Sequence, residues 1–136
     1  MPYDTKIVIA VREDLATWKK LNVTAFLAGG LVRSYPELAG DRYADADGRA
    51  YGPLVRQPVL VFAGSGADLS LVLARALDRG LAPSIYTQAL FATNNDSDNR
   101  ATVAAVATDA LDLAGLALHA DRRIVDKVVK GLSLHA

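Results

Sequence analysis

An unbroken apolar run near the start of the chain, residues 6–11 (KIVIAV), constrains the fold more than any other segment. The run shows no alternation of polar and apolar residues, so we expect a strand that is buried on both faces, as in the middle of an α/β sheet. A charged patch follows at once, and a second apolar segment, rich in alanine, leucine and glycine, extends over residues 23–32. This order predicts a buried strand, a polar loop and a closely packed helix.

The same alternation continues along the chain. Further strands are expected at residues 58–63, 82–88 and 111–119, and helices at residues 23–32, from Asp68 to about Arg79, from Asp98 through Thr102 to Val106, and at 122–132. The expected helix N-caps are Asn22, Asp68, Asp98 and Asp121. With right-handed crossovers, these elements form a three-layer α/β/α sandwich with a mixed, mostly parallel sheet of about four strands. We expect one domain over residues 1–136.

Two segments fall outside this alternation. The sequence YADADGRAY, residues 43–51, has aromatic ends around an Asp-Gly pair, which predicts a small hairpin or a surface excursion. The polar run FATNNDSDNR, residues 91–100, is expected to be a loop. Gly29 and Gly30 weaken their helix, so we expect them to allow a close approach to a neighbouring backbone.

Composition excludes several classes of function. Fifteen basic residues balance fifteen acidic ones, which is unlike a dedicated nucleic-acid binder. The chain has no cysteine, so disulfides, thiolate metal sites and cysteine nucleophiles are excluded. The start of the chain lacks the features of a signal peptide, and no apolar stretch approaches the length of a membrane span. We therefore expect a cytoplasmic protein with no membrane partner.

Both ends of the chain resemble the type II peptidyl-tRNA hydrolases. The opening IVIAVREDL precedes a lysine-containing loop and an alanine-rich helix, and the matching residues are Val11, Arg12, Asp14, Leu15, Lys20, Val23 and Ala25. The segments LAGLALH and DRRIVDKVVKGLSL are similar to that family's closing strand and helix. The chain is most similar to an uncharacterised branch of this fold, the domain of unknown function two thousand family. The resemblance implies the hydrolase fold and makes a dimer plausible.

Two positions depart from the hydrolase pattern. Asn22 stands where that family has a lysine, and Thr87 and Gln88 stand where an aspartate is expected. The resemblance therefore implies a protein without the usual lysine/aspartate pair, and a small-ligand-binding or accessory role. Two alternatives stay open. One is a hydrolase of an acylated or peptidyl-tRNA ester, with Lys20 replacing the lysine and Asp14 or Asp96 supplying the carboxylate. The other is a homo-oligomeric scaffold that buries the Ala/Gly helix face between subunits.

The expected site lies where the 12–24 loop meets the 87–96 loop at the sheet edge. Its candidate ligand-binding residues are Arg12, Trp18, Lys20, Asn22, Ser65, Thr87, Gln88 and Asn94, and its candidate catalytic residues are Lys20 and Asp14. The fitting ligand is a small molecule or a tRNA-like anion, since a guanidinium binds carboxylate or phosphate and an indole stacks on rings.

Each of these residues also has a purely structural interpretation. Arg12 could pair with Asp14 or Glu13, Trp18 could pack over the helix edge, and Ser65 could belong to a tight turn within Gly64-Ser65-Gly66 instead of an anion-binding nest. His119 and His135 lack metal-ligand neighbours in the sequence, so we expect neither a metal nor a cofactor.

Overall fold

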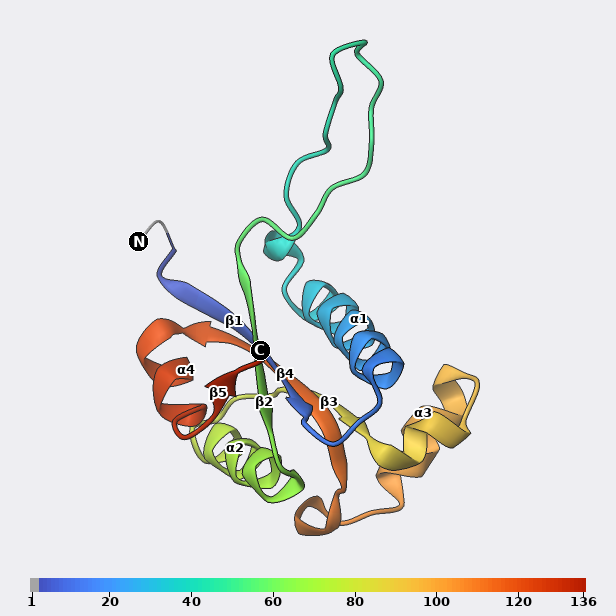
Figure 1. Ribbon diagram of the computed structural model, residues 1–136, viewed down its shortest axis with the longest axis vertical. Helices are drawn as coiled ribbons and strands as arrows, with labels where there is room; N and C mark the ends of the chain where they lie inside the picture. The colour runs from blue at the N-terminus through green and yellow to red at the C-terminus, as the bar shows by residue number, and fades with distance from the viewer. Residues whose placement is uncertain (1–2) are drawn as a thin grey trace.

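The computed structural model describes residues 3–136, which contain one five-stranded mixed sheet with helices on both faces (Figure 1). In sheet order the strands are β3 (Ser84–Thr87), β4 (Leu113–Asp121), β1 (Thr5–Arg12), β2 (Val59–Gly64) and β5 (Ser133–Leu134). β1 lies in the centre and its residues 7–11 are buried, as its unbroken apolar run predicts.

The expectation of about four mostly parallel strands is wrong. Among the strand pairings within residues 3–136, only β1–β2 is parallel, whereas β1–β4, β3–β4 and β2–β5 are antiparallel, and β5 is an additional short strand. An apolar run shows that a strand is buried on both faces, but it carries no information about strand direction. β4 was therefore recognisable from its leucines, while its antiparallel insertion between β1 and β3 was not.

The helices cover the two faces unequally. α1 (Thr17–Ser34) packs on one face, over β1, β4 and β3. α2 (Gly66–Asp78) and α4 (Arg122–Val128) pack on the other. α3 (Asp96–Ala104) and the 3-10 helix η2 (Gln88–Ala92) follow β3, and two further 3-10 turns are η1 (Pro36–Leu38) and η3 (Thr108–Ala110). Among residues 3–136, no helix combines the length and apolarity that a membrane crossing requires.

α1 begins earlier than its apolar pattern indicates. Ala16 is its N-cap, so Asn22 lies inside the helix, exposed, and is not the cap expected from the sequence. The first buried residue of α1 is Val23. Because no residue of the preceding turns is buried, these turns show no apolar stripe by which a helix could be recognised. The helix ends at Ser34, directly before Tyr35-Pro36, as expected.

The other helix boundaries follow their capping groups. Ser65 caps α2, and its hydroxyl accepts from the Asp68 N–H while the Asp68 carboxylate accepts from the Ser65 N–H. Asn95 caps α3, so α3 starts inside the segment expected to be a loop, and Asp98 is not its cap. Asp121 caps α4 as expected. α4 ends at Val128, earlier than expected, and the chain then forms β5.

Small residues let α1 approach the sheet closely. A Cβ atom added to Gly115 of β4 would lie 2.7 Å from Val23 Cγ1 and 3.0 Å from the Ala10 carbonyl oxygen. A Cβ on Gly30 would lie 3.3 Å from Ser84 Oγ, so Gly30 allows a close approach to β3, but to a side chain and not to the backbone that the sequence predicts. Gly29 has open space beside it, and for this residue the expectation is wrong.

The segment around the Asp-Gly pair forms an arm, which we define as residues 41–54. It projects away from the sheet and helices as a two-stranded ribbon (Figure 1), and every residue in it is exposed. The Tyr51 N–H donates to the Tyr43 carbonyl oxygen at 2.7 Å, and the Asp45 N–H donates to the Arg49 carbonyl oxygen at 3.0 Å. The expected hairpin is therefore present, as a long excursion from the body.

Replacing Gly115 with alanine should destabilise the protein by about 1–3 kcal/mol, because the new methyl group would overpack against Val23 and Leu27 of α1 and against the Ala10 carbonyl of β1. Gly29→Ala is the matched control: its Cβ meets open space within α1, so the variant should be neutral or slightly more stable. Urea unfolding followed by circular dichroism measures both. A Gly115→Ala protein as stable as the wild type would contradict the close packing of α1 on β4.

Candidate functional site

The end of the sheet where β1, β2 and β3 finish carries a charged rim, which we define as Arg12, Asp14 and Asp112. Arg12 is the last residue of β1, and its side chain is only 17% exposed. Its guanidinium donates to both carboxylate oxygens of Asp14, at 3.1 and 3.0 Å, and to Asp112 at 2.8 Å. One cation thus ties the end of β1 to the segment that enters β4.

The ion pair sets the protonation of the rim. Hydrogen bonds from Arg12 lower the pKa of Asp14, and those same bonds, with further ones to Asp112, raise the pKa of Arg12. Both groups therefore stay charged at neutral pH. Of the alternatives left open by the sequence, the pairing of Arg12 with Asp14 is the one present in the structure.

Arg12 also lies over the turn that precedes α2. A Cβ atom on Gly66 would come within 3.1 Å of its guanidinium, so this turn has a cation beside it. Ser65, a candidate ligand-binding residue, uses its hydroxyl and its N–H in the capping box with Asp68.

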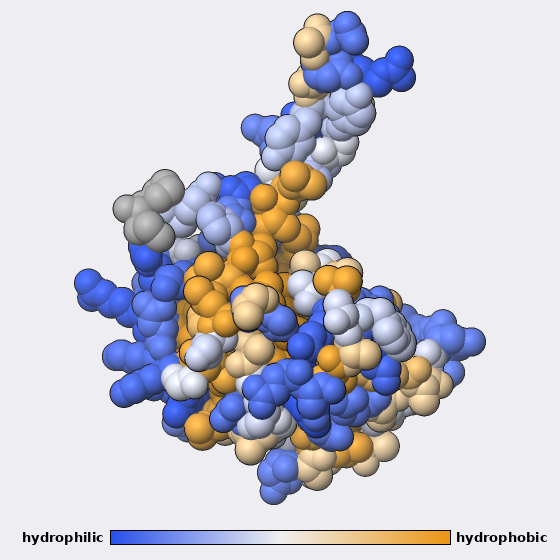
Figure 2. Space-filling model, in the orientation of Figure 1, coloured by the Kyte–Doolittle hydropathy of each residue, from blue (hydrophilic) through white to orange (hydrophobic). Residues whose placement is uncertain are grey.

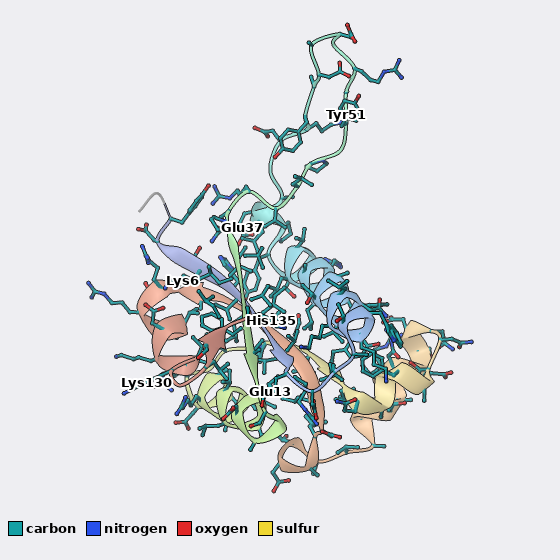
Figure 3. All side chains as sticks on the ribbon, viewed as in Figure 1. Lys6, Glu13, Glu37, Tyr51, Lys130 and His135 are labelled. Carbon is teal, nitrogen blue, oxygen red and sulfur yellow. The ribbon has the colours of Figure 1, made fainter. Side chains whose placement is uncertain are left out.

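Lys20 pairs with a histidine that sequence reasoning set aside. Its ammonium lies 3.1 Å from His135 Nε2, next to β2 (His135 is labelled in Figure 3). The His135 main-chain N–H donates to the Val61 carbonyl oxygen, and its Nδ1 lies 2.8 Å from the Ala136 carbonyl oxygen. Nδ1 then carries the proton, which leaves Nε2 to accept from Lys20. Lys20 also helps to lower the pKa of Asp14 through its charge.

Aromatic side chains link the start of α1 to the segment after β3. Trp18 is 61% exposed and meets Phe91 edge-on, with ring centroids 6.2 Å apart, while the Lys19 ammonium lies 4.7 Å from the Phe91 centroid. Tyr86 packs on Phe91 at 5.1 Å and on Phe26 at 5.7 Å. Trp18 thus packs at the helix edge and keeps most of its surface in solvent.

A groove lies between α1, β3 and α3, beside this aromatic cluster. We call it the β3 groove; its volume is about 550 Å³. Apolar side chains of α1, β3, η2 and α3 line most of it: Phe26, Leu27, Ile85, Tyr86, Leu90 and Val103. Polar side chains also line it, namely those of Ser84, Asp96, Asn99 and Arg100. Asp96 and Arg100 form an exposed ion pair one helical turn apart.

The two segments expected to converge do meet, by a different route. β1 and β3 are not neighbours, because β4 lies between them. Contact comes instead through Asp112, whose carboxylate accepts from Arg12 while its carbonyl accepts from the Gln88 N–H at 2.8 Å, and through the Trp18–Phe91 pair.

The remaining candidate residues are scattered. Thr87 is buried in its strand, and with Gln88 it lines a separate hollow of about 150 Å³. Asn94 is exposed and accepts from the Asn95 amide, and Asn22 faces solvent on α1. None of the predicted ligand-binding residues lines the β3 groove.

Sequence reasoning missed the residues that do shape the two sites. Asp112 was included in the expected fourth strand. It in fact precedes β4, and its carboxylate accepts a hydrogen bond from Arg12. His135 reaches Lys20 only because β5 brings the last residues back to β2. Asn99 and Arg100 stood in the expected loop, and the Asn95 cap followed by two acidic residues was the signal for a helix there.

Replacing Arg12 with alanine should destabilise the protein by about 1–2 kcal/mol through the loss of its charge-assisted hydrogen bonds. Arg12→Lys should recover only part, because an ammonium lacks the planar fork that holds Asp14. Urea unfolding at several pH values measures the effect, with Arg123→Ala as the exposed control.

The pH dependence of this effect has a definite sign. The pKa of Asp14 is lowered in the folded protein, so the contribution of the pair is present at neutral pH and is lost as pH falls below about 4. The difference between wild type and Arg12→Ala should shrink over that range. A difference independent of pH would contradict a role for the Arg12–Asp14 pair.

Comparisons with known proteins place the chain among uncharacterised relatives. A family model described as "Protein of unknown function (DUF2000)" matches residues 5–136. The solved structure of Atu0240, a protein of unknown function from Agrobacterium tumefaciens strain C58, is similar with a TM-score of 0.96 and 44% identity, covering 98% of this chain and 99% of that one. No curated protein matches. Neither match identifies the peptidyl-tRNA hydrolase fold, so that part of the resemblance stays a prediction.

Proposed function

We propose that this chain, which belongs to the DUF2000 family, is a small-ligand-binding protein whose ligand occupies the β3 groove. The observation that carries the proposal is the groove itself, with apolar walls and a few polar side chains. Its volume of about 550 Å³ falls within the range of roughly 300–1,000 Å³ that small-molecule sites occupy.

The groove offers specific polar partners as well as apolar surface. Asn99 and Arg100 project from the same helix, and the Ser84 hydroxyl lies on β3 opposite them. β3 is an edge strand, because β4 is its single neighbour within residues 3–136. Its outer edge therefore has main-chain hydrogen-bonding groups without a strand partner, beside the residues of β3 that line the groove.

These partners suggest the class of ligand. An apolar ring or chain would cover Phe26, Tyr86 and Val103, whose burial would provide most of the affinity. A carboxylate, phosphate or sulfonate at one end would pair with Arg100, in competition with Asp96. The contacts at the charged rim differ, since the Arg12 guanidinium there is already engaged by two carboxylates.

The fluorescent probe 1-anilinonaphthalene-8-sulfonate combines an aromatic body with an anionic group and tests this groove. We expect saturable binding, with amide shifts in NMR spectra concentrated at residues 84–86 and 99–104. Val103→Asp should weaken binding roughly ten-fold or more, because it places a carboxylate in the apolar wall. Phe26→Ala, at a more exposed wall position, should weaken it without affecting folding.

Ala101→Asp is the matched control, since residue 101 lies on the same helix, is exposed and does not line the groove. It should bind the probe as the wild type does. Equal binding by the wild type, Val103→Asp and Phe26→Ala, or shifts confined to other segments, would contradict the proposal.

A second candidate function rests on the Lys20–His135 pair. A lysine held 3.1 Å from an imidazole, close enough to Asp14 to lower its pKa, supplies groups that could orient water for hydrolysis of an acylated or peptidyl-tRNA ester. Asp14 would be the carboxylate of such a site, although it is now paired with Arg12.

Release of a blocked amino acid from tRNA tests the hydrolase directly. If Lys20 acts in catalysis, Lys20→Ala should lower the rate about 10²-fold or more, while Lys19→Ala, one residue away and stacked on Phe91, should retain it. Rates equal to background for the wild type and both variants would remove this function for that substrate.

A further inference from the structure

We propose that the arm and the adjoining outer surface of α1 form the interface of a homodimer, in which each arm packs against the α1 side of the second copy. This proposal is independent of the ligand groove, because the two surfaces lie on different sides of α1. The observations that carry it are the projecting arm, an uncovered apolar surface at its base, and the opposite net charges of the arm and α1.

The arm is ordered by its own hydrogen bonds but is not packed against its own body. Besides the main-chain bonds of the ribbon, the Tyr51 hydroxyl donates to Asp45 at 2.7 Å, and Asp45 accepts from the Arg49 N–H at 2.9 Å. Tyr43 and Tyr51 are nevertheless about half exposed. An isolated two-stranded hairpin is marginally stable in water, so a partner surface would account for a ribbon of this length.

An apolar surface begins where the arm joins the body, and Figure 2 shows it over the arm base and β2. A hollow of about 410 Å³ lies there between α1 and the arm base, lined by Ala28, Gly29, Val32, Ala39, Pro53, Leu54 and Val55. Leu54 is 65% exposed, and Leu21, further along α1, is 67% exposed. Surface leucines this exposed, next to an open apolar hollow, mark an interaction surface.

The unequal coverage of the sheet explains why this surface is open. α1 packs over β1, β4 and β3, so the α1 side of β2 lies beside the helix instead of beneath it. Val59 and Val61 of β2 consequently remain only half-buried, although β2 pairs with the central strand. A second copy placed on this side would complete the layer that α1 leaves unfinished.

The arm points away from α1 of its own subunit, so it does not cover this surface itself (Figure 1). In a two-fold dimer the same patch is used by both subunits, and an arm that leaves one body meets the equivalent face of the other. The occupant that fits is therefore a second copy of this chain.

Charge and size agree with this occupant. Apart from Lys19, which lies over Phe91 on the groove side, α1 carries two cationic residues, Lys20 and Arg33, and no acidic one, whereas the arm carries three aspartates and two arginines. The fourteen exposed residues of the arm, with the seven exposed residues of α1 that remain when Trp18 and Phe26 on the groove side are left out, match the roughly 20–30 residues per side of a stable interface. The chain as a whole has no net charge, so two copies do not repel each other.

Sedimentation velocity over a range of concentrations tests the proposal on the full chain. We expect the wild type to have twice the 14.4 kDa monomer mass. Leu54→Asp in the arm base and Leu21→Asp on α1 should each raise the dimer dissociation constant roughly ten-fold or more, because each places a charge in the interface. Leu71→Asp makes the same substitution at an exposed leucine of α2 on the opposite face, and this control should leave the dimer unchanged.

Hydrogen exchange on the same samples locates the interface. The Tyr51 and Asp45 amides of the arm should exchange more slowly in the dimer than in the Leu21→Asp monomer, whose arm sequence is intact. A wild type of 14.4 kDa at every concentration would overturn the proposal. So would a dimer that survives both leucine substitutions, or one that Leu71→Asp dissociates.

Discussion

The close contact between α1 and β4 is the constraint on which the rest of the structure depends. At Gly115 the Val23 and Leu27 side chains of α1 approach β4 so closely that a single methyl group on residue 115 would not fit. This contact fixes where α1 crosses the sheet, and with it the positions of Phe26 and Leu27 in the β3 groove. It also fixes Lys20 near His135. Two candidate sites far apart in sequence thus share one packing contact, which contains no functional group.

The two faces of β4 explain the asymmetry of the layers. Leu113, Leu116 and Leu118 point to the side of α2 and α4, whereas Ala114 and Ala117 lie on the side of α1. Leu113 and Leu116 are three residues apart yet share a face, and the pairing of β4 with β3 shifts register between Tyr86 and Thr87 at this point. Large side chains fill the space under two helices, and small ones let a single helix lie close. A single helix cannot cover five strands, so β2 and the arm base stay open on that side.

Features that depend on the burial of local residues could be predicted from the sequence. Features that depend on contacts between distant segments could not. The four main strands follow from apolar runs, and the arm follows from its Asp-Gly turn. The first turns of α1 and the whole of α3 contain no buried side chain, so neither helix start is marked by an apolar pattern. Strand direction has no such mark either, because a buried strand has the same apolar run whichever way it points. Among site residues, Arg12 could be predicted as an ion-pair partner because Asp14 is two residues away. Asp112 could not, because only the antiparallel insertion of β4 brings it to Arg12.

This arrangement separates the charged rim from the groove in chemical terms. At the rim, Arg12 meets two carboxylates, so an incoming anion would have to displace Asp14 or Asp112 and leave a carboxylate without its partner. In the groove, the ion pair of Arg100 with Asp96 is exposed on both sides, and exchanging such a partner costs little free energy. Each of the two candidate sites thus has an arginine that could bind an anion, Arg12 at the rim and Arg100 in the groove. Both carry the same charge, and the greater solvent exposure of the Arg100 ion pair makes Arg100 the one whose partner can be exchanged. We therefore place the proposed ligand in the groove and not at the rim, where Arg12 holds the sheet end together.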